Sequence, residues 1–201
     1  MTAVLTGLGL AAAAGLNAWA VLLLFNGLFR LLPQEFPGPV AAFLASPLVL
    51  QIALVLFLAE FVADKVPFLD RFWDFGHTLL RPAVGVLLAF ACVPPTTLAA
   101  RIALGTGAAL MTLATHIAKS TTRLTSTAAT RGLTQVAVSL VEDIVAVLLA
   151  TLVFFLPWMS AILLVGVLVL LATHRHRVFR ALQVLFFRLQ HPRRRRPEAA
   201  A

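Results

Sequence analysis

Long apolar runs separated by short polar or proline-containing stretches dominate the pattern along this chain of 201 residues. The first run extends from about Val4 to Leu28 and closes at Arg30, Pro33 and Pro37. A helix needs about 20 apolar residues to cross a bilayer. The pattern therefore predicts a first helix of crossing length that is not interrupted.

A second helix is expected from Pro47 to about Val66. Ser46 and Pro47 are residue types preferred at the N-cap and at the first helical position. The apolar run that follows them is also long enough to cross a membrane.

The third helix is harder to define. Pro67 to Leu80 is amphipathic, with polar residues at helical spacing on one stripe, as is typical of a membrane interface. Pro82 to Val93 has only 12 residues, which make about 18 Å of helix against roughly 30 Å of hydrocarbon. This segment is either joined to the amphipathic one or forms a short or broken helix.

Three further helices are expected beyond this point: Leu98 to Ala118, Leu133 to Leu156, and Trp158 to Thr173 after Pro157. A Ser/Thr-rich loop is expected from Ser120 to Arg131. The chain is thus predicted to be an all-α integral membrane bundle of about six spans.

The distribution of basic residues favours six spans. With six, 14 Lys and Arg residues lie on the side of both termini and two on the other; with five, the division is 12 against four. Cytoplasmic loops carry the excess of Lys and Arg. The absence of Tyr and the richness in Ala, Leu and Arg suggest a bacterial source, so we expect a bacterial inner membrane with both termini in the cytoplasm.

Six spans also divide into three plus three, the arrangement of inverted-repeat transporters. Gln51 to Asp64 and Gln135 to Ala146 resemble each other, although the Gln-to-Glu spacing differs by two. A 3+3 inverted repeat is therefore one arrangement that fits the chain.

Composition supports membrane residence and limits the domain organisation. Hydrophobic residues make up 61% of the chain and charged residues 12%, against roughly 25% charged in soluble domains. We expect one transmembrane domain, residues 1–174, with no room for a soluble catalytic domain. Residues 175–201 form a basic tail, which suits an amphipathic helix on anionic lipids and makes a nucleic-acid partner unnecessary.

Ionisable residues inside or beside the apolar runs are the candidate functional residues, because charge at membrane depth must face protein or water. The candidates for binding a solute or ion are Glu60, Asp64, Lys65, Arg81, His116, Lys119, Arg123, Ser139, Glu142 and Asp143. The alternative is a set of structural ion pairs that satisfy one another.

Two parts of this set suggest particular chemistry. Glu142 lies near mid-membrane and, unless a base is paired with it, could bind and release a proton or a cation. His116, Lys119 and Arg123 follow helical spacing and lead into hydroxyl residues, which suits phosphate, carboxylate or a lipid headgroup. The alternatives are a permanent ion pair and an ordinary interfacial segment.

Asp70, Asp74 and His77 share one helical face and could hold Mg, Mn or Zn, although an interfacial polar stripe explains the same residues. No other cofactor is indicated. Asn17 and Asn26 in the first helix are expected mainly to pack against other helices.

A set of short elements along the chain carries a family resemblance: Gly15-Leu16-Asn17-Ala18, Ala63-Asp64-Lys65, Pro67, Asp70, Trp73-Asp74, His77-Thr78, Arg81-Pro82, Gly85, His116, Lys119, Arg123, Ser139 and Glu142-Asp143. With these the chain resembles the bacterial domain-of-unknown-function family 4126, up to about Val153. It departs from the family in the Ser/Thr-rich stretch that follows Arg123 and in the basic tail. The resemblance implies a small multi-pass membrane protein and no particular activity.

These observations favour the hypothesis that the protein is a transporter or channel-like protein for a small ionic solute or lipid headgroup. It would carry a charged site facing the cytoplasm and could form a homodimer. Two alternatives remain open: a membrane-embedded, metal-dependent enzyme acting on a lipid phosphate, and a structural membrane scaffold.

Overall fold

The computed structural model describes residues 1–64, 67–130 and 135–173. Every regular element in this part of the chain is helical, which confirms the predicted all-α class. In chain order the elements are α1 (Thr2–Leu16), α2 (Ala18–Leu31), the 3₁₀ helix η1 (Pro33–Glu35), α3 (Pro39–Leu44), α4 (Pro47–Ala63), α5 (Pro67–Cys92), α6 (Leu98–Thr130), α7 (Gln135–Phe155) and α8 (Met159–Thr173). The helix predicted in the basic tail lies outside the described residues.

The first apolar run forms two helices, so the prediction of one continuous helix from Val4 to Leu28 is wrong. Asn17 separates α1 from α2 and has an extended backbone, with φ −148° and ψ 101°. Its side-chain oxygen accepts a hydrogen bond from the Ala20 N–H at 2.9 Å, as an N-cap residue does. This capping bond is the local reason why a new helix starts here.

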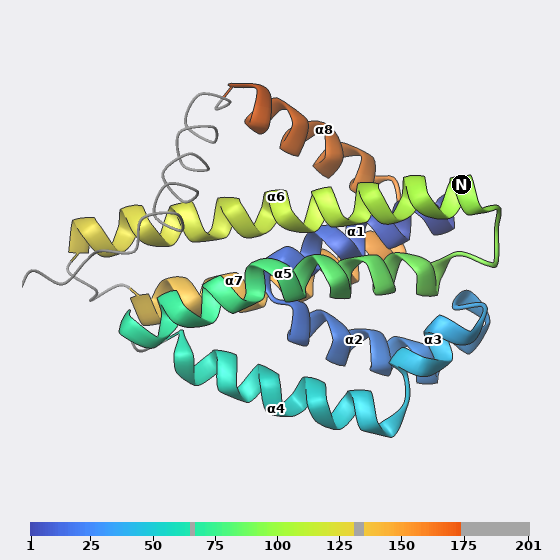
Figure 1. The fold of residues 1–201 in the computed structure, drawn as a ribbon, viewed down its shortest axis with the longest axis horizontal. Coiled ribbons are helices and arrows are strands. Elements are labelled where there is room, and N and C mark those ends of the chain that lie inside the picture. Colours follow the sequence, from blue (N-terminus) through green and yellow to red (C-terminus); the bar gives the residue numbers. More distant parts are fainter. Residues whose placement is uncertain (65–66, 131–134, 174–201) are drawn as a thin grey trace, which may run out of the picture.

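α1 and α2 form a hairpin whose two outer ends lie on the same side of the fold (Figure 1). Thr2 and Thr6 at the start of α1 line one cavity together with Leu32 and Phe36, which follow α2. The chain therefore runs inward along α1, reverses at Asn17, and returns along α2 to the side of the fold where α1 began.

α5 is one continuous helix of 26 residues that contains Pro82. Of the two alternatives for the third helix, the joined one is confirmed and the short or broken one is wrong. Proline removes a single backbone donor, and packed helices tolerate this loss because neighbouring groups satisfy the freed carbonyl. At 1.5 Å per residue α5 is about 39 Å long, so its length no longer prevents a crossing.

The Ser/Thr-rich segment is helical as far as Thr130, so the loop predicted from Ser120 to Arg131 is wrong for the residues described. The segment holds neither glycine nor proline before Gly132. Ser and Thr stay compatible with a helix when their hydroxyl groups bond the carbonyl four residues earlier. Such residues are therefore weak evidence for a loop unless a helix breaker accompanies them.

α1 is the central helix of the fold. α5, α6 and α7 pack around it, and α2 and α8 also contact it. Its buried residues are mostly small: Gly7, Gly9, Ala11, Ala12, Ala13, Ala14 and Gly15. At Gly7 an added Cβ would come within 2.9 Å of the Ala89 Cα in α5. Small side chains thus allow the helix backbones to approach closely.

Aromatic side chains close the end of the fold where the hairpin begins and ends. The Phe25 ring of α2 lies edge-on to Phe36, with centroids 4.8 Å apart, and Phe36 stacks on Phe154 of α7 at 5.4 Å. Asn26 donates to the Leu44 carbonyl at 2.8 Å, which joins α2 to α3 and fits the packing role predicted for this asparagine.

The remaining helices begin and end close to their predicted positions. α4 starts as expected, with the Ser46 hydroxyl accepting from the Val49 N–H at 3.4 Å and proline at the first helical position. α7 and α8 agree with the prediction, and the turn between them contains Pro157. Local signals therefore located these elements well.

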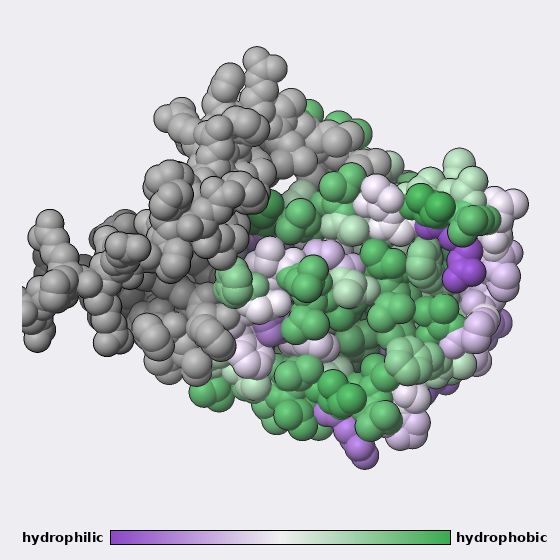
Figure 2. All heavy atoms as spheres, in the orientation of Figure 1, coloured by the Kyte–Doolittle hydropathy of each residue, from purple (hydrophilic) through white to green (hydrophobic). Residues whose placement is uncertain are grey.

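Two helical segments, Phe75–Cys92 and Leu98–Ser120, are long and apolar enough to cross a membrane by length and composition. α1, α2 and α4 are shorter apolar helices. Large apolar side chains are exposed along α4 and α7, and hydrophobic residues cover much of the described face in Figure 2. These features indicate membrane association, whereas the six crossings and the inverted repeat stay predictions.

Candidate functional site

The reversal between α1 and α2 exposes backbone carbonyls at the end of α1 that the helix itself cannot satisfy. Arg81 of α5 donates from Nη1 to the Gly15 carbonyl at 3.0 Å. Lys119 of α6 donates from Nζ to the Leu16 carbonyl at 2.7 Å. The partial negative charge at a helix C-terminus favours cations, so the break brings two buried cations to one place.

Two threonines of α6 hold the same stretch of α1 from its side. Thr112 donates from Oγ1 to the Ala11 carbonyl and Thr115 to the Ala12 carbonyl, each at 2.8 Å. A carbonyl oxygen has two lone pairs and can accept such an additional bond. These contacts fix the position of α1 next to the residues of α6 that carry the charge.

Glu60, near the end of α4, binds both cations. Its Oε1 accepts from Arg81 Nη2 at 2.6 Å and from Lys119 Nζ at 3.4 Å, and all three side chains have 0% exposure. Breaking a buried pair by removing one partner typically costs about 3–5 kcal/mol. The other oxygen, Oε2, is buried and has no hydrogen-bond partner among the described residues.

Lys119 also faces two further acids. Its Nζ lies 3.8 Å from Asp64 Oδ2 at the C-cap of α4, and 3.8 Å from Glu142 Oε2 of α7. With Leu16 and Glu60, oxygens from α1, α4 and α7 surround one ammonium group.

α7 is joined to this network at two more points. Ser139 donates from Oγ to Asp64 Oδ2 at 3.3 Å, and Asn17 donates from Nδ2 to Asp143 Oδ1 at 2.8 Å. Ser139 is fully buried, whereas the Glu142 side chain is 12% exposed. The edge of the network that reaches the surface is therefore on α7.

His116 of α6 is held in one neutral tautomer. Its Nδ1 lies 2.7 Å from Arg81 Nη1 and its Nε2 lies 3.2 Å from Thr78 Oγ1. A guanidinium group can only donate, so Nδ1 accepts and the proton sits on Nε2, which donates to the threonine.

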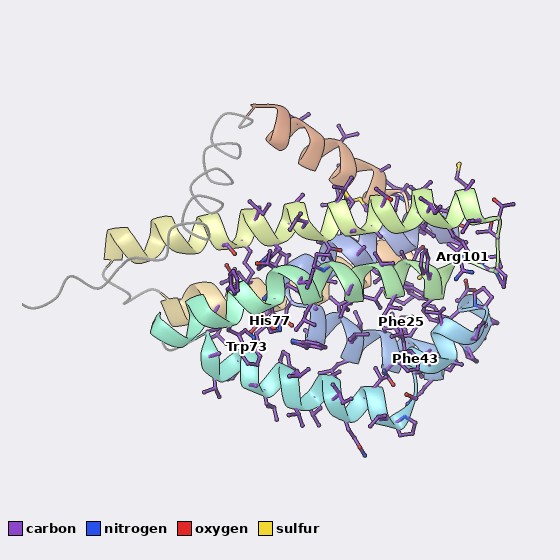
Figure 3. The ribbon with its side chains drawn as sticks, in the orientation of Figure 1. Phe25, Phe43, Trp73, His77 and Arg101 are labelled. Atoms are coloured by element: carbon purple, nitrogen blue, oxygen red, sulfur yellow. The ribbon has the colours of Figure 1, made fainter. Side chains whose placement is uncertain are left out.

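His77 of α5 is held in the opposite tautomer. The Trp19 indole donates from Nε1 to His77 Nε2 at 2.8 Å, so the proton sits on Nδ1 and bonds the Trp73 carbonyl at 2.9 Å. The imidazole also stacks on Trp73, with centroids 4.8 Å apart. Trp73 and His77 lie on the half of α5 near the network, whereas Arg101 lies at the opposite end of the fold, near the start of α6 (Figure 3).

Most of the predicted ion-binding residues come together around the helix break: Glu60, Asp64, Arg81, His116, Lys119, Ser139, Glu142 and Asp143. The side chains of Lys65 and Arg123 lie outside the described part of the structure. Asn17, which was expected mainly to pack, caps α2 and donates a hydrogen bond to Asp143.

The threonines and the backbone carbonyls of the site were not among the predicted residues. Thr112 and Thr115 stand one turn before His116 and Lys119 on α6, and this helical spacing is a signal that could have revealed the threonines. The carbonyl acceptors leave no signal in side-chain types.

The predicted metal site stays a prediction, because the side chains of Asp70 and Asp74 lie outside the described residues. Both ring nitrogens of His77 are engaged in hydrogen bonds. In the part of the chain that the structure describes, no group of three or more His, Cys, Asp or Glu residues is arranged to hold a metal ion.

A family model described as "Domain of unknown function (DUF4126)" matches residues 4–177. The chain belongs to this family. The match includes the Ser/Thr-rich segment and continues past Val153 into the start of the basic tail, two regions that the predicted resemblance did not include. No curated protein and no solved structure matches the chain.

Proposed function

We propose that this protein is a transporter or channel-like protein of the bacterial inner membrane that moves a small ionic solute or a lipid headgroup. The observation that supports this proposal is the convergence of ionisable side chains from α4, α5, α6 and α7 on the reversal between α1 and α2. Discontinuous helices with charged residues at the break are a recurrent way to build a solute site in a membrane.

The depth of the network fits a position within the membrane. Arg81 lies about 17 Å from the Cys92 end of α5, and Glu60 lies about 20 Å from the Pro47 start of α4, at 1.5 Å of rise per residue. Within a hydrocarbon core of roughly 30 Å, both would lie in the half farther from these two helix ends. Ionisable residues at such depth are functional candidates by default.

The basic end of the fold is proposed to face the cytoplasm. The chain beyond α8 is rich in arginine, and Arg123 follows the network residues His116 and Lys119 along α6. An excess of Lys and Arg is typical of cytoplasmic segments. We also propose that the tail binds anionic lipids, and the support for this contact is the arginine content of its sequence. A homodimer stays a prediction.

The metal-dependent enzyme receives less support than transport. A metal ligated by His77 would have to displace the bond from Trp19 or the bond to the Trp73 carbonyl. The scaffold differs from the transporter in a measurable way, because a scaffold moves no solute.

Uptake into proteoliposomes tests the proposal. The purified full-length chain is reconstituted and assayed with four tracers: sodium, rubidium, phosphate and methylammonium. We expect protein-dependent uptake of at least one tracer, at least tenfold slower for Glu60→Gln and unchanged for Glu35→Gln, an exposed acid at the opposite end. Absence of protein-dependent uptake for all four, or equal uptake by Glu60→Gln, would overturn the proposal.

A further inference from the structure

The oxygens around Lys119 outnumber the protons that its ammonium group can donate. An ammonium group has three N–H donors. Four oxygens approach Nζ: the Leu16 carbonyl at 2.7 Å, Glu60 Oε1 at 3.4 Å, Asp64 Oδ2 at 3.8 Å and Glu142 Oε2 at 3.8 Å. Only the carbonyl contact is short.

These distances suit a nitrogen cation better than a metal ion. Magnesium and calcium bind oxygen at about 2.0–2.6 Å, whereas an N–H donor and an oxygen acceptor lie about 2.7–3.2 Å apart, with ion pairs somewhat longer. Among the described residues no metal-binding group of acids is found. The surroundings of Nζ are therefore those of an ammonium site.

A second observation is that one buried carboxylate oxygen at the same place could accept a further hydrogen bond. Glu60 is fully buried, and its Oε2 has no hydrogen-bond partner among the described residues. The two oxygens of one carboxylate share a carbon atom, so Oε2 belongs to the cluster that Oε1 forms with Arg81 and Lys119. Buried acceptors are normally satisfied, and a ligand with N–H donors would satisfy this one.

We propose that the acidic network around Lys119 recognises the ammonium group of a small primary amine, and that the Lys119 side chain is a tethered occupant of the site that the solute displaces. This inference deepens the proposed function by naming its substrate class. It disfavours an anionic solute, because the described contacts of Arg81 and Lys119 already go to carboxylate, carbonyl and imidazole acceptors.

Replacement of the tethered amine by a free one is the first test. Lys119→Ala removes the ammonium group and three of the four side-chain carbons. n-Butylammonium supplies an ammonium group on an alkyl chain one methylene longer than the part removed. We expect n-butylammonium chloride to raise the unfolding temperature of Lys119→Ala in detergent in a concentration-dependent manner, because a ligand that binds only the folded state stabilises it.

The controls separate ammonium recognition from a general salt effect. Tetramethylammonium chloride has the same charge but no N–H donor, and sodium chloride has neither a donor nor an alkyl chain. Arg101→Ala on the same helix removes an exposed cation far from the network. Equal stabilisation by tetramethylammonium or sodium, or an equal response of Arg101→Ala, would overturn the inference.

The wild-type chain provides a second test if Lys119→Ala does not fold. Methylammonium should enter proteoliposomes at least tenfold faster than rubidium, and unlabelled n-butylammonium should compete with it. Uptake of sodium, rubidium or phosphate without uptake of methylammonium would overturn this inference and leave transport standing. Rescue of Lys119→Ala by n-butylammonium without uptake of any tracer would overturn transport and leave the ammonium site standing.

Discussion

The Arg81 guanidinium donates to Glu60 Oε1 across 2.6 Å, and both side chains are completely buried. The same arginine binds the Gly15 carbonyl at the end of α1. One side chain on α5 therefore connects α4 with the α1–α2 hairpin, and the stability of the hairpin depends on charge as well as on apolar packing.

Neutralising Glu60 should destabilise the fold strongly. In Glu60→Gln, Arg81 and Lys119 stay buried but lose the carboxylate that they share, so we expect the free energy of unfolding to fall by about 3–5 kcal/mol. Denaturation in detergent, followed by tryptophan fluorescence, measures the change. Glu35→Gln at an exposed site is the control, and equal midpoints for the two variants would contradict the expectation.

Exchanging the residues of the Asn17–Asp143 contact tests its polarity. Asn17→Asp keeps an N-cap residue but places two carboxylates opposite each other, so we expect a loss of about 1–3 kcal/mol. Adding Asp143→Asn restores a donor and an acceptor, and the double variant should recover most of the loss in the same denaturation assay. Additive losses from the two substitutions would show that the contact does not operate as a pair.

Two glycine substitutions should have effects of opposite sign. A Cβ at Gly15 would overlap the Thr115 side chain and the Thr112 carbonyl, and overpacking of this kind typically costs about 1–3 kcal/mol. At Gly27 no atom lies within 4 Å of an added Cβ. Because alanine favours helix over glycine, Gly27→Ala should stabilise α2 by up to about 1 kcal/mol. Thermal unfolding of the two variants provides the comparison, and a shift of the same sign in both would refute this packing argument.

The two histidines should give different nitrogen spectra. His77 is predicted to carry its proton on Nδ1 and His116 on Nε2, because Trp19 and Arg81 can only donate to them. ¹⁵N NMR of imidazole-labelled protein distinguishes these tautomers. Trp19→Phe should change the ¹⁵N chemical shifts of the His77 ring and leave those of the His116 ring unchanged. If the two rings of the wild-type protein showed the same tautomer, the assignment would be refuted.

The gathering of acids and bases could be predicted from the sequence because its physical cause is general. Glu60, Lys119 and Glu142 each interrupt or adjoin an apolar run, and charge in such a position must face protein or water. The structure brings Glu60 and Glu142 to the same ammonium group, that of Lys119. The repeat itself stays a prediction.

The reversal at Asn17 could not be predicted in the same way. The residues on both sides of it are apolar, so hydropathy is continuous through the break, and a single asparagine is also tolerated inside a helix. Tertiary contacts add to the Asn17 cap: cations from α5 and α6 bind the freed carbonyls of Gly15 and Leu16. The sequence contains both partners but does not indicate that they meet.

The hairpin also bears on which compartment the first residue faces. On the proposal that each longer helix crosses the bilayer, the α1–α2 hairpin adds no net crossing, and the five helices α4 to α8 remain as crossings. Five is odd, whereas the expectation that both ends of the polypeptide share the cytoplasm needs an even number. Reporters fused before Met1 and after the last residue should therefore be found on opposite faces of the membrane.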